Sequence, residues 1–426
     1  SNATTVTDRQ WVTAIDPALV SIAGRRVEGF LAYHLPAAGQ YIQAITEDGA
    51  PVPQAVPQIL EVAQSGPIRV DNSGGPAHGW IWQPYRNGGG FKVATAPAAD
   101  YADPLAWRTY HVSSDQPAIF PWFNLDDAGN AYALWVTAGV AYLAVSPIDD
   151  PRNDPRDGGR PGTYWADKVR VTPDEIRSAV LPVVTAGASG RIGLAYVGSE
   201  DCVATGTSVS DNCPLTTTWH TYATVIEDAL ALARGETATA VTGRVSHRVV
   251  HRGSVCTGGT TCTGDRSLLD MIDIGLDASG RLGVVFMDNN NRLAAPNETD
   301  NAKQGPFVHF AKQVTGPTLS AAAPTVAIDI PRNARPDAAG DATWPNRAGA
   351  ANLPALDLRG AQLAVAGDDI IARIRVADTS VAGAQRDLAA YNAVPQAGLP
   401  AERVQHVVRF AAGFVVFTFK DEFAAL

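Results

Sequence analysis

Three blocks of the chain share one pattern of apolar and polar positions. They are residues 120–136 (FPWFNLDDAGNAYALWV), 181–197 (LPVVTAGASGRIGLAYV) and 271–287 (MIDIGLDASGRLGVVFM). In each block an apolar run leads into a cluster of small and polar residues and then into a second apolar run, with Gly129, Gly190 and Gly280 in register. Because glycine adopts positive φ at little steric cost, each block predicts two strands joined by a tight turn.

A second repeat follows these hairpins. Short apolar strands that end in turn residues begin at Tyr41, Phe91, Ala141, Thr221 and Val308. The first three starts are 50 residues apart, and the later gaps lengthen where cysteine-containing insertions lie. A unit of about 40–50 residues with four short strands is typical of a β-propeller blade.

We therefore predict an all-β protein built on a six-bladed β-propeller. Five blades are recognisable within residues 8–316, and residues 317–353, rich in Ala, Pro and Asp, predict a linker or long loop. Residues 354–426 contain four further strands that depart from the hairpin pattern. They form either the sixth blade or a small appended β-domain.

The composition fits this fold and excludes some partners. Charged residues make up 18% of the 426 residues, whereas Gly and Pro number 39 and 29, as expected for many short strands joined by turns. A net charge of −10 argues against nucleic acid or an anionic membrane as partner, since both attract clustered Lys and Arg. We expect no membrane insertion, because no run approaches about 20 apolar residues.

The four cysteines fall into two local pairs. Cys202 and Cys213 bracket one polar loop, and Cys256 and Cys262 bracket another. Neither pair has the CxxC spacing of a zinc site, so we expect two local disulfides and an oxidising compartment. Ser1-Asn2-Ala3 resembles the remnant of a cleaved tag, and we expect a secreted or cell-surface protein whose signal peptide has been removed.

Several stretches together resemble a known family. The sequence DRQW, the in-register DxxG hairpins, and HRGSVCTGGTTCTGDRSLLD at residues 251–270 are similar to secreted bacterial proteins of the sialidase-like (BNR-repeat) propeller superfamily. The resemblance covers residues 8–316 and implies a propeller fold and action on carbohydrate. The Asp-box of sialidases occurs only in degraded form, as LDDAGNAYALW, and the Arg-Ile-Pro motif is absent. No catalytic residue is carried over from the family.

Propeller geometry narrows the search for a site. The innermost strand of each blade begins beside the central axis, so residues at these strand starts are expected to converge on one funnel. They are Asp8, Arg9, Arg69, Asp71, Trp122, Asp265, Arg266 and Asp270.

These residues suggest a site for an acidic sugar. Arg9, Arg69 and Arg266 are suited to a bidentate grip on a carboxylate or sulfate. Two of the four aspartates, Asp8, Asp71, Asp265 and Asp270, would serve as the acid and base of glycoside hydrolysis. The alternative is structural, because an Asp-Arg pair at a strand start can close the ring by hydrogen bonds between neighbouring blades.

Two further residues have both a functional and a structural interpretation. Trp122 either stacks on a sugar or packs between blades. His251 either reaches the funnel as a proton carrier or lies in a loop beside a disulfide. No metal is predicted, because the acidic loop 149–157 lacks calcium-loop spacing, and no cofactor is predicted.

Two functions from different classes follow. The first is a glycoside hydrolase for an acidic sugar, and the second is a non-catalytic propeller that binds a glycan or protein partner at the cell surface. We expect a monomer in either case. Family resemblance alone cannot separate them, because function resides in the site rather than in the fold.

Overall fold

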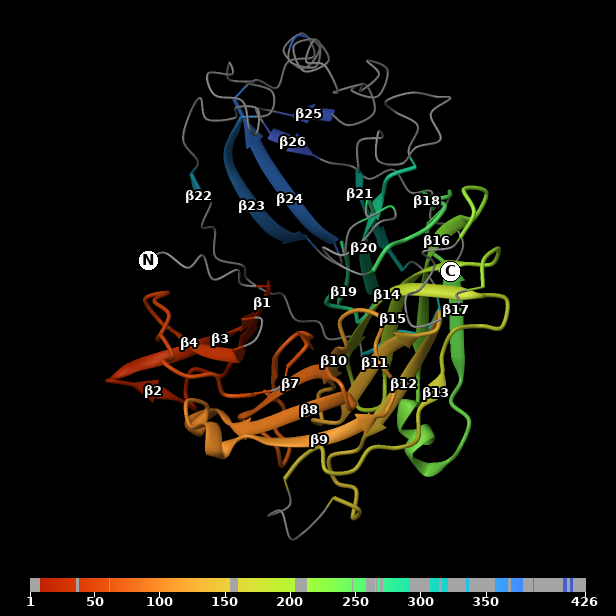
Figure 1. Ribbon diagram of the computed structural model, residues 1–426. Helices are drawn as coiled ribbons and strands as arrows, with labels where there is room; N and C mark the ends of the chain where they lie inside the picture. Colours follow the sequence, from red (N-terminus) through yellow and green to blue (C-terminus); the bar gives the residue numbers. More distant parts are fainter. Residues whose placement is uncertain are drawn as a thin grey trace, which may run out of the picture.

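The structure is a computed structural model of the 426-residue chain, drawn in Figure 1. The described residues are 8–35, 38–60, 62–153, 160–203, 213–246, 248–257, 265, 267–268, 271–290, 307–313, 316–320, 335–336, 357–366, 369–377, 386, 409–411 and 414–416.

The described part is almost entirely β-structure. Helix is limited there to short segments such as the 3₁₀ helices η1 (Ala98–Asp100), η2 (Pro104–Ala106) and η4 (Ala229–Arg234). None of the helices in this part of the chain has the length and apolar character needed to cross a membrane. The prediction of an all-β fold is confirmed.

Five antiparallel sheets follow one another along the chain. Blade 1 contains β1 (Asp8–Ala14), β2 (Ser21–Ile22), β3 (Arg25–Leu35) and β4 (Gly39–Thr46), and blade 2 contains β5 (Gln64–Ser65), β6 (Arg69–Val70), β7 (Trp80–Asn87), β8 (Gly90–Pro97) and β9 (Arg108–Ser113). Blade 3 contains β10 (Trp122–Leu125), β11 (Ala131–Thr137), β12 (Val140–Ser146) and β13 (Val169–Arg170). Blade 4 contains β14 (Ser178–Ala186), β15 (Ile192–Ser199), β16 (Thr218–Ile226), β17 (Ala240–Arg244) and β18 (His251–Arg252). Blade 5 contains β19 (Ile272–Leu276), β20 (Leu282–Asp288) and β21 (Phe307–Lys312).

The inner strands of these sheets lie next to one another in chain order. Strand β1 contacts β6, β6 contacts β10, β10 contacts β14, and β14 contacts β19. Figure 1 shows the five sheets fanning outward from these strands. The molecule is therefore a five-blade β-propeller arrangement.

A sixth sheet lies in the C-terminal part of the chain. It contains β22 (Arg335–Pro336), β23 (Leu358–Ala366), β24 (Asp369–Val376), β25 (Arg409–Ala411) and β26 (Phe414–Val416). The prediction of six blades is not supported, because the propeller arrangement comprises five. Of the predicted linker 317–353, the described residues 317–320 are packed against blades 4 and 5, and Leu319 is fully buried.

The predicted hairpins form as expected. Strands β10 and β11, β14 and β15, and β19 and β20 pair in antiparallel fashion. Gly129, Gly190 and Gly280 all have positive φ, at 88°, 79° and 75°. The turn glycines thus have the positive φ that the sequence pattern predicts.

Neighbouring hairpin turns are joined by polar contacts. The buried carboxylate of Asp126, at the turn of blade 3, accepts hydrogen bonds from the backbone N–H of Gly190 in blade 4 (2.8 Å) and from the hydroxyl of Tyr132 (2.6 Å). Between blades 1 and 2, the side chain of Asn72 accepts from the N–H of Asp16 and donates to the carbonyl of Ala14. The turns are one of the places where the blades hold each other in register.

Candidate functional site

The candidate site lies where the inner strands meet. Trp11 in β1 and Trp122 in β10 are in edge-to-face contact, with ring centroids 5.5 Å apart. Blades 1 and 3 are not neighbours, because β6 of blade 2 lies between their inner strands. Both indoles must therefore project toward the centre of the arc.

Two opposite charges act on each other across the same centre. Arg69 is the first residue of β6, and Asp273 lies in β19 of blade 5. Burial lowers the pKa of Arg69, and the negative charge of Asp273 opposes this shift. Since blades 3 and 4 separate these two strands along the arc, the interaction crosses the middle of the molecule. We call Trp11, Arg69, Trp122 and Asp273 the central site.

Arg69 and Trp11 of the central site carry hydrogen-bond donors that the described residues do not satisfy. The Nη1 of Arg69 donates to the carbonyl of Ile68 (3.0 Å), and its guanidinium makes no other hydrogen bond with the described part of the chain. The Nε1 of Trp11 is buried and also has no partner there. The indole donor is buried without an acceptor, which is costly, whereas Arg69 is partly exposed and its remaining N–H groups can reach solvent or a ligand. The centre is therefore suited to a group that brings oxygen acceptors.

The predicted arginines and acids do not all come together. Asp8 and Arg9 belong to β1, where the backbone register places Asp8 opposite His34 of β3. Arg266 and Asp270 lie outside the described residues. Trp122 is buried, with 8% of its surface exposed, and packs against Trp11 rather than presenting an open face.

Asp71 lies at the end of its inner strand rather than at the start. Strand β6 is only two residues long, and Asp71 follows it in the turn, where its Oδ1 accepts from the N–H of Ser73 (2.8 Å). The side chain is 1% exposed and is directed at Gly129 of the next turn. It thus occupies in blade 2 the turn position that Asp126 occupies in blade 3.

Asp265 is engaged in local structure. Its Oδ1 accepts hydrogen bonds from both the N–H (2.7 Å) and the hydroxyl (2.5 Å) of Ser267. The carboxylate thus stabilises a short turn between these two residues. Ser267 in turn accepts from the side chain of Asn289 (2.6 Å). This carboxylate is tied to the connection between blades 4 and 5.

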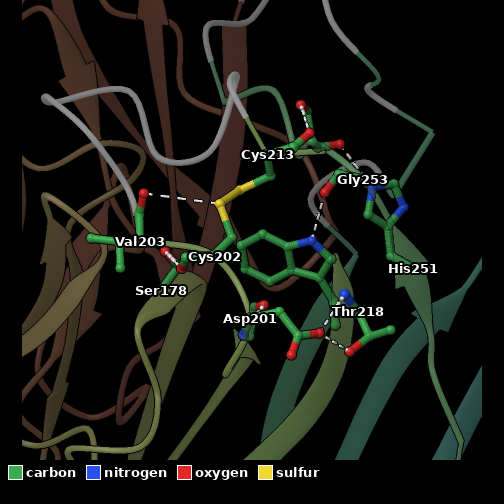
Figure 2. Close-up of a disulfide and its surroundings, with 11 residues drawn as sticks. Ser178, Asp201, Cys202, Val203, Cys213, Thr218, His251 and Gly253 are labelled. Atoms are coloured by element: carbon green, nitrogen blue, oxygen red, sulfur yellow. Dashed lines mark hydrogen bonds between the residues drawn. A yellow bond between two sulfur atoms is a disulfide. The ribbon is translucent and has the colours of Figure 1, made fainter. Parts of the chain in front are cut away.

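His251 belongs to the same polar network. It is fully buried, and its Nδ1 and Nε2 lie 2.9 Å from the side-chain oxygen of Asn289 and 2.8 Å from the carbonyl of Ser254. Both ring nitrogens are therefore occupied by protein groups. Figure 2 shows His251 beside the disulfide-bonded segment, where it belongs to strand β18 rather than to a loop.

The disulfide prediction is confirmed for the first pair. Cys202 and Cys213 are bonded, with an S–S distance of 2.00 Å (Figure 2). Cys256 is also disulfide-bonded, whereas Cys262 lies outside the described residues. The hydroxyl of Ser254 donates to the carbonyl of Cys213 (3.0 Å), so the two cysteine-containing segments are in contact.

No group of three or more metal-binding side chains occurs among the residues whose placement is described. Sequence reasoning missed Trp11 and Asp273. The signal for Trp11 was present in DRQW, where the residue falls in the first inner strand directly after the charged residues. Asp273 gives no such signal, because it sits in an apolar strand and gains significance only from the residue across the arc.

Comparison with known proteins gives no further guide, because no protein-family model and no curated protein matches the chain. A function must therefore be argued from the central site itself.

Proposed function

We propose that the protein is a secreted, sialidase-like propeller that binds an acidic carbohydrate at its central site. Its architecture in this proposal is a monomeric ring of six blades, with the sheet β22–β26 as the sixth. The observation that carries the proposal is Arg69, a partly buried cation at the centre of the arc whose guanidinium makes one hydrogen bond with the described residues.

The chemistry of the site favours an anionic ligand with several oxygens. A guanidinium offers five donors in a planar fork that matches a carboxylate or sulfate. The indole N–H of Trp11 is a further donor that has no acceptor among the described residues. Asp273 lies across the arc and is exposed, which suits it to accept hydrogen bonds from sugar hydroxyls.

Binding is better supported than hydrolysis. Most glycoside hydrolases need two carboxyl groups about 5–10 Å apart across the scissile bond. Within the described part of the chain, Asp273 is the carboxylate associated with the central site, whereas Asp71 and Asp265 hold turns. Hydrolysis of an acidic glycoside is the second candidate function, because the charge of Asp273 acts on Arg69 and a carboxyl from Asp8 or Asp270 would complete the required pair.

The test is calorimetric titration with a uronic-acid oligosaccharide, with sialic acid, and with the carboxyl-reduced neutral form of the oligosaccharide. We expect an acidic ligand to bind and the neutral form to bind at least about tenfold more weakly. Arg69→Ala should remove the preference, and Arg69→Lys should restore part of it because the charge remains while the fork is lost.

The matched control is Arg25→Ala. Arg25 is paired with Asp48 (2.9 Å) on the surface of blade 1, where the two side chains are 43% and 51% exposed. Equal affinity for acidic and neutral ligands, or an Arg69→Ala protein that binds as well as the Arg25→Ala protein, would overturn the proposal. Turnover that Asp273→Asn abolishes while binding persists would establish hydrolysis instead.

A further inference from the structure

Blades 1 and 2 meet along two faces that are mostly apolar. Phe30 and Ile42 of blade 1 and Ile81 and Tyr85 of blade 2 belong to one buried cluster. Strand β3 of blade 1 also contacts strand β5 of blade 2. We call the boundary between these two faces the seam. A polar side chain buried in the seam needs a hydrogen-bond partner, because burial removes it from bulk water.

Blade 1 contributes a buried glutamine to the seam. Gln40 is the second residue of β4 and alternates with Ile42 and Ala44, so its side chain lies on the same face as theirs, toward blade 2. The residue is fully buried. Neither its Oε1 nor its Nε2 has a hydrogen-bond partner among the residues that the structure describes. The blade 1 side of the seam thus offers both a donor and an acceptor.

Blade 2 contributes a glutamine and a serine to the same seam. Gln83 alternates with Tyr85 along β7, and Ser65 of β5 lies opposite Tyr85, so both face blade 1. Both are buried. The Nε2 of Gln83 donates to backbone carbonyls, one of them that of Gly66 (2.9 Å). Its Oε1 and the hydroxyl of Ser65 have no partner within the described part of the chain.

A hollow lies on the blade 2 side of the seam. Lys92 of β8 is also opposite Tyr85, across β7 from Ser65, so all three side chains lie on one face of the sheet. A hollow of about 460 Å³ is lined by Lys92, Val62, Ala63 and residues 87–89. The polar atoms of the seam are therefore only one or two residues away from a place that water can enter.

We infer that the seam is an internal water site, in which ordered water molecules bridge Gln40 of blade 1 to Gln83 and Ser65 of blade 2. Water both donates and accepts, so it satisfies the amide of Gln40, the Oε1 of Gln83 and the hydroxyl of Ser65 together. A buried water molecule needs about two to four polar partners, and these side chains supply them from both blades. This inference does not depend on the proposed function.

The water site also supports the inner strand of blade 2. Gly66, which accepts from Gln83, packs so closely on Pro121 that an added methyl group would strike the carbonyl oxygen of Pro121. The same segment leads into β6, which begins at Arg69. Water bound to Gln83 therefore lies beside the backbone that leads to Arg69, and it helps to hold that backbone between blades 1 and 3.

The first test is a crystal structure of the full chain that resolves ordered solvent. We expect at least one water molecule within hydrogen-bond distance of Gln40 and of either Gln83 or Ser65. A seam without solvent would overturn the inference. So would a seam in which another side chain of this protein meets the polar atoms of Gln40 and Gln83.

A substitution at Gln40 gives a second test, because its sign differs between a hydrated seam and a dry one. Gln40→Leu removes both polar atoms at nearly constant volume. In a hydrated seam the remaining partners lose their bridge, so we expect the denaturant midpoint of unfolding to fall. In a dry seam the same change would remove two unpaired groups, and the midpoint would rise.

The matched control is Gln43→Leu on the other face of β4, where the Nε2 of Gln43 donates to the hydroxyl of Tyr33 (3.0 Å). We expect the midpoint to fall further in Gln40→Leu than in this control. A midpoint that rises, or that falls no further than in the control, would overturn the inference. If Gln40→Leu does not fold, the crystal structure of the unaltered chain decides between the two states of the seam.

Discussion

Blades 3 and 4 and blades 1 and 5 are built from the same hairpin yet stand in different environments. In the middle of the arc, strands such as β11 and β15 are packed on both faces. The apolar side chains of β15 and of one face of β11 belong to one large cluster that extends from Ile119 to Leu319, and the other face of β11 belongs to a second cluster shared with blade 2. At the ends of the arc each blade buries one face and exposes the other. The hairpin determines the fold of a blade, whereas its neighbours determine how much that blade contributes to stability.

The largest expected effect is the difference in stability loss between truncating a buried apolar side chain and truncating an exposed one. Leu194 in β15 is fully buried, whereas Met271, just before β19, is 57% exposed. Leu194→Ala should lower the free energy of unfolding by about 2–5 kcal/mol, and Met271→Ala should lower it by less than about 0.5 kcal/mol. Chemical denaturation of the two variants checks this. Similar losses would mean that the end face is as well packed as the centre.

Two glycines, one in blade 4 and one in blade 5, extend the comparison to the backbone. Gly187, beside the turn of blade 4, lies against the backbone of Leu319, and an added methyl group would clash with the carbonyl oxygen of that residue. Gly275 in β19 has no atom within 4 Å of such a methyl group. Gly187→Ala should therefore cost about 1–3 kcal/mol, whereas Gly275→Ala should be neutral or stabilise by about 0.5–1 kcal/mol.

Thermal unfolding of the two glycine variants measures this difference in stability. A stable Gly187→Ala protein would show that the segment after blade 5 is free to move away from the turn. It would also show that the hydrogen bond from the N–H of Ala188 to the carbonyl of Leu319 (2.7 Å) does not hold it there.

The smallest expected effect is a pH dependence in blade 4. Burial lowers the pKa of His220 below its ordinary value of 6.5, and the charge of Arg244 acts in the same direction. The unfolded chain therefore takes up the proton first, so stability is complete above pH 6.5 and declines as the pH falls from there toward the folded pKa. His220→Gln should flatten this slope, whereas His78→Gln on an exposed turn should leave it unchanged. An unaltered slope in the His220 variant would assign the pH dependence to another group.

Much of the fold was predictable because it repeats. The spacing of Gly129, Gly190 and Gly280 identified three hairpins, and the local pairing of Cys202 with Cys213 followed from their separation. The blade count did not follow, because the C-terminal strands depart from the hairpin pattern. How those strands pack depends on tertiary contacts that leave no period in the sequence.

The site was harder to predict than the fold. Arg69 was predicted correctly as a strand start, because strand starts converge in a propeller. Asp71 was wrongly predicted to lie at the start of its strand, since β6 is only two residues long and ends before it. Asp273 could not be singled out, because its importance comes from a residue some 200 positions away in the chain. Sequence patterns identify the residues of a single strand or turn more readily than they identify contacts between residues far apart in the chain.

The most direct test of the central claim is a crystal structure of the full chain soaked with an acidic oligosaccharide. We predict ordered sugar whose carboxylate or sulfate contacts the guanidinium of Arg69, with hydroxyl groups directed to Asp273. Sugar bound elsewhere, or a centre in which side chains of this protein already saturate the guanidinium of Arg69, would contradict the account.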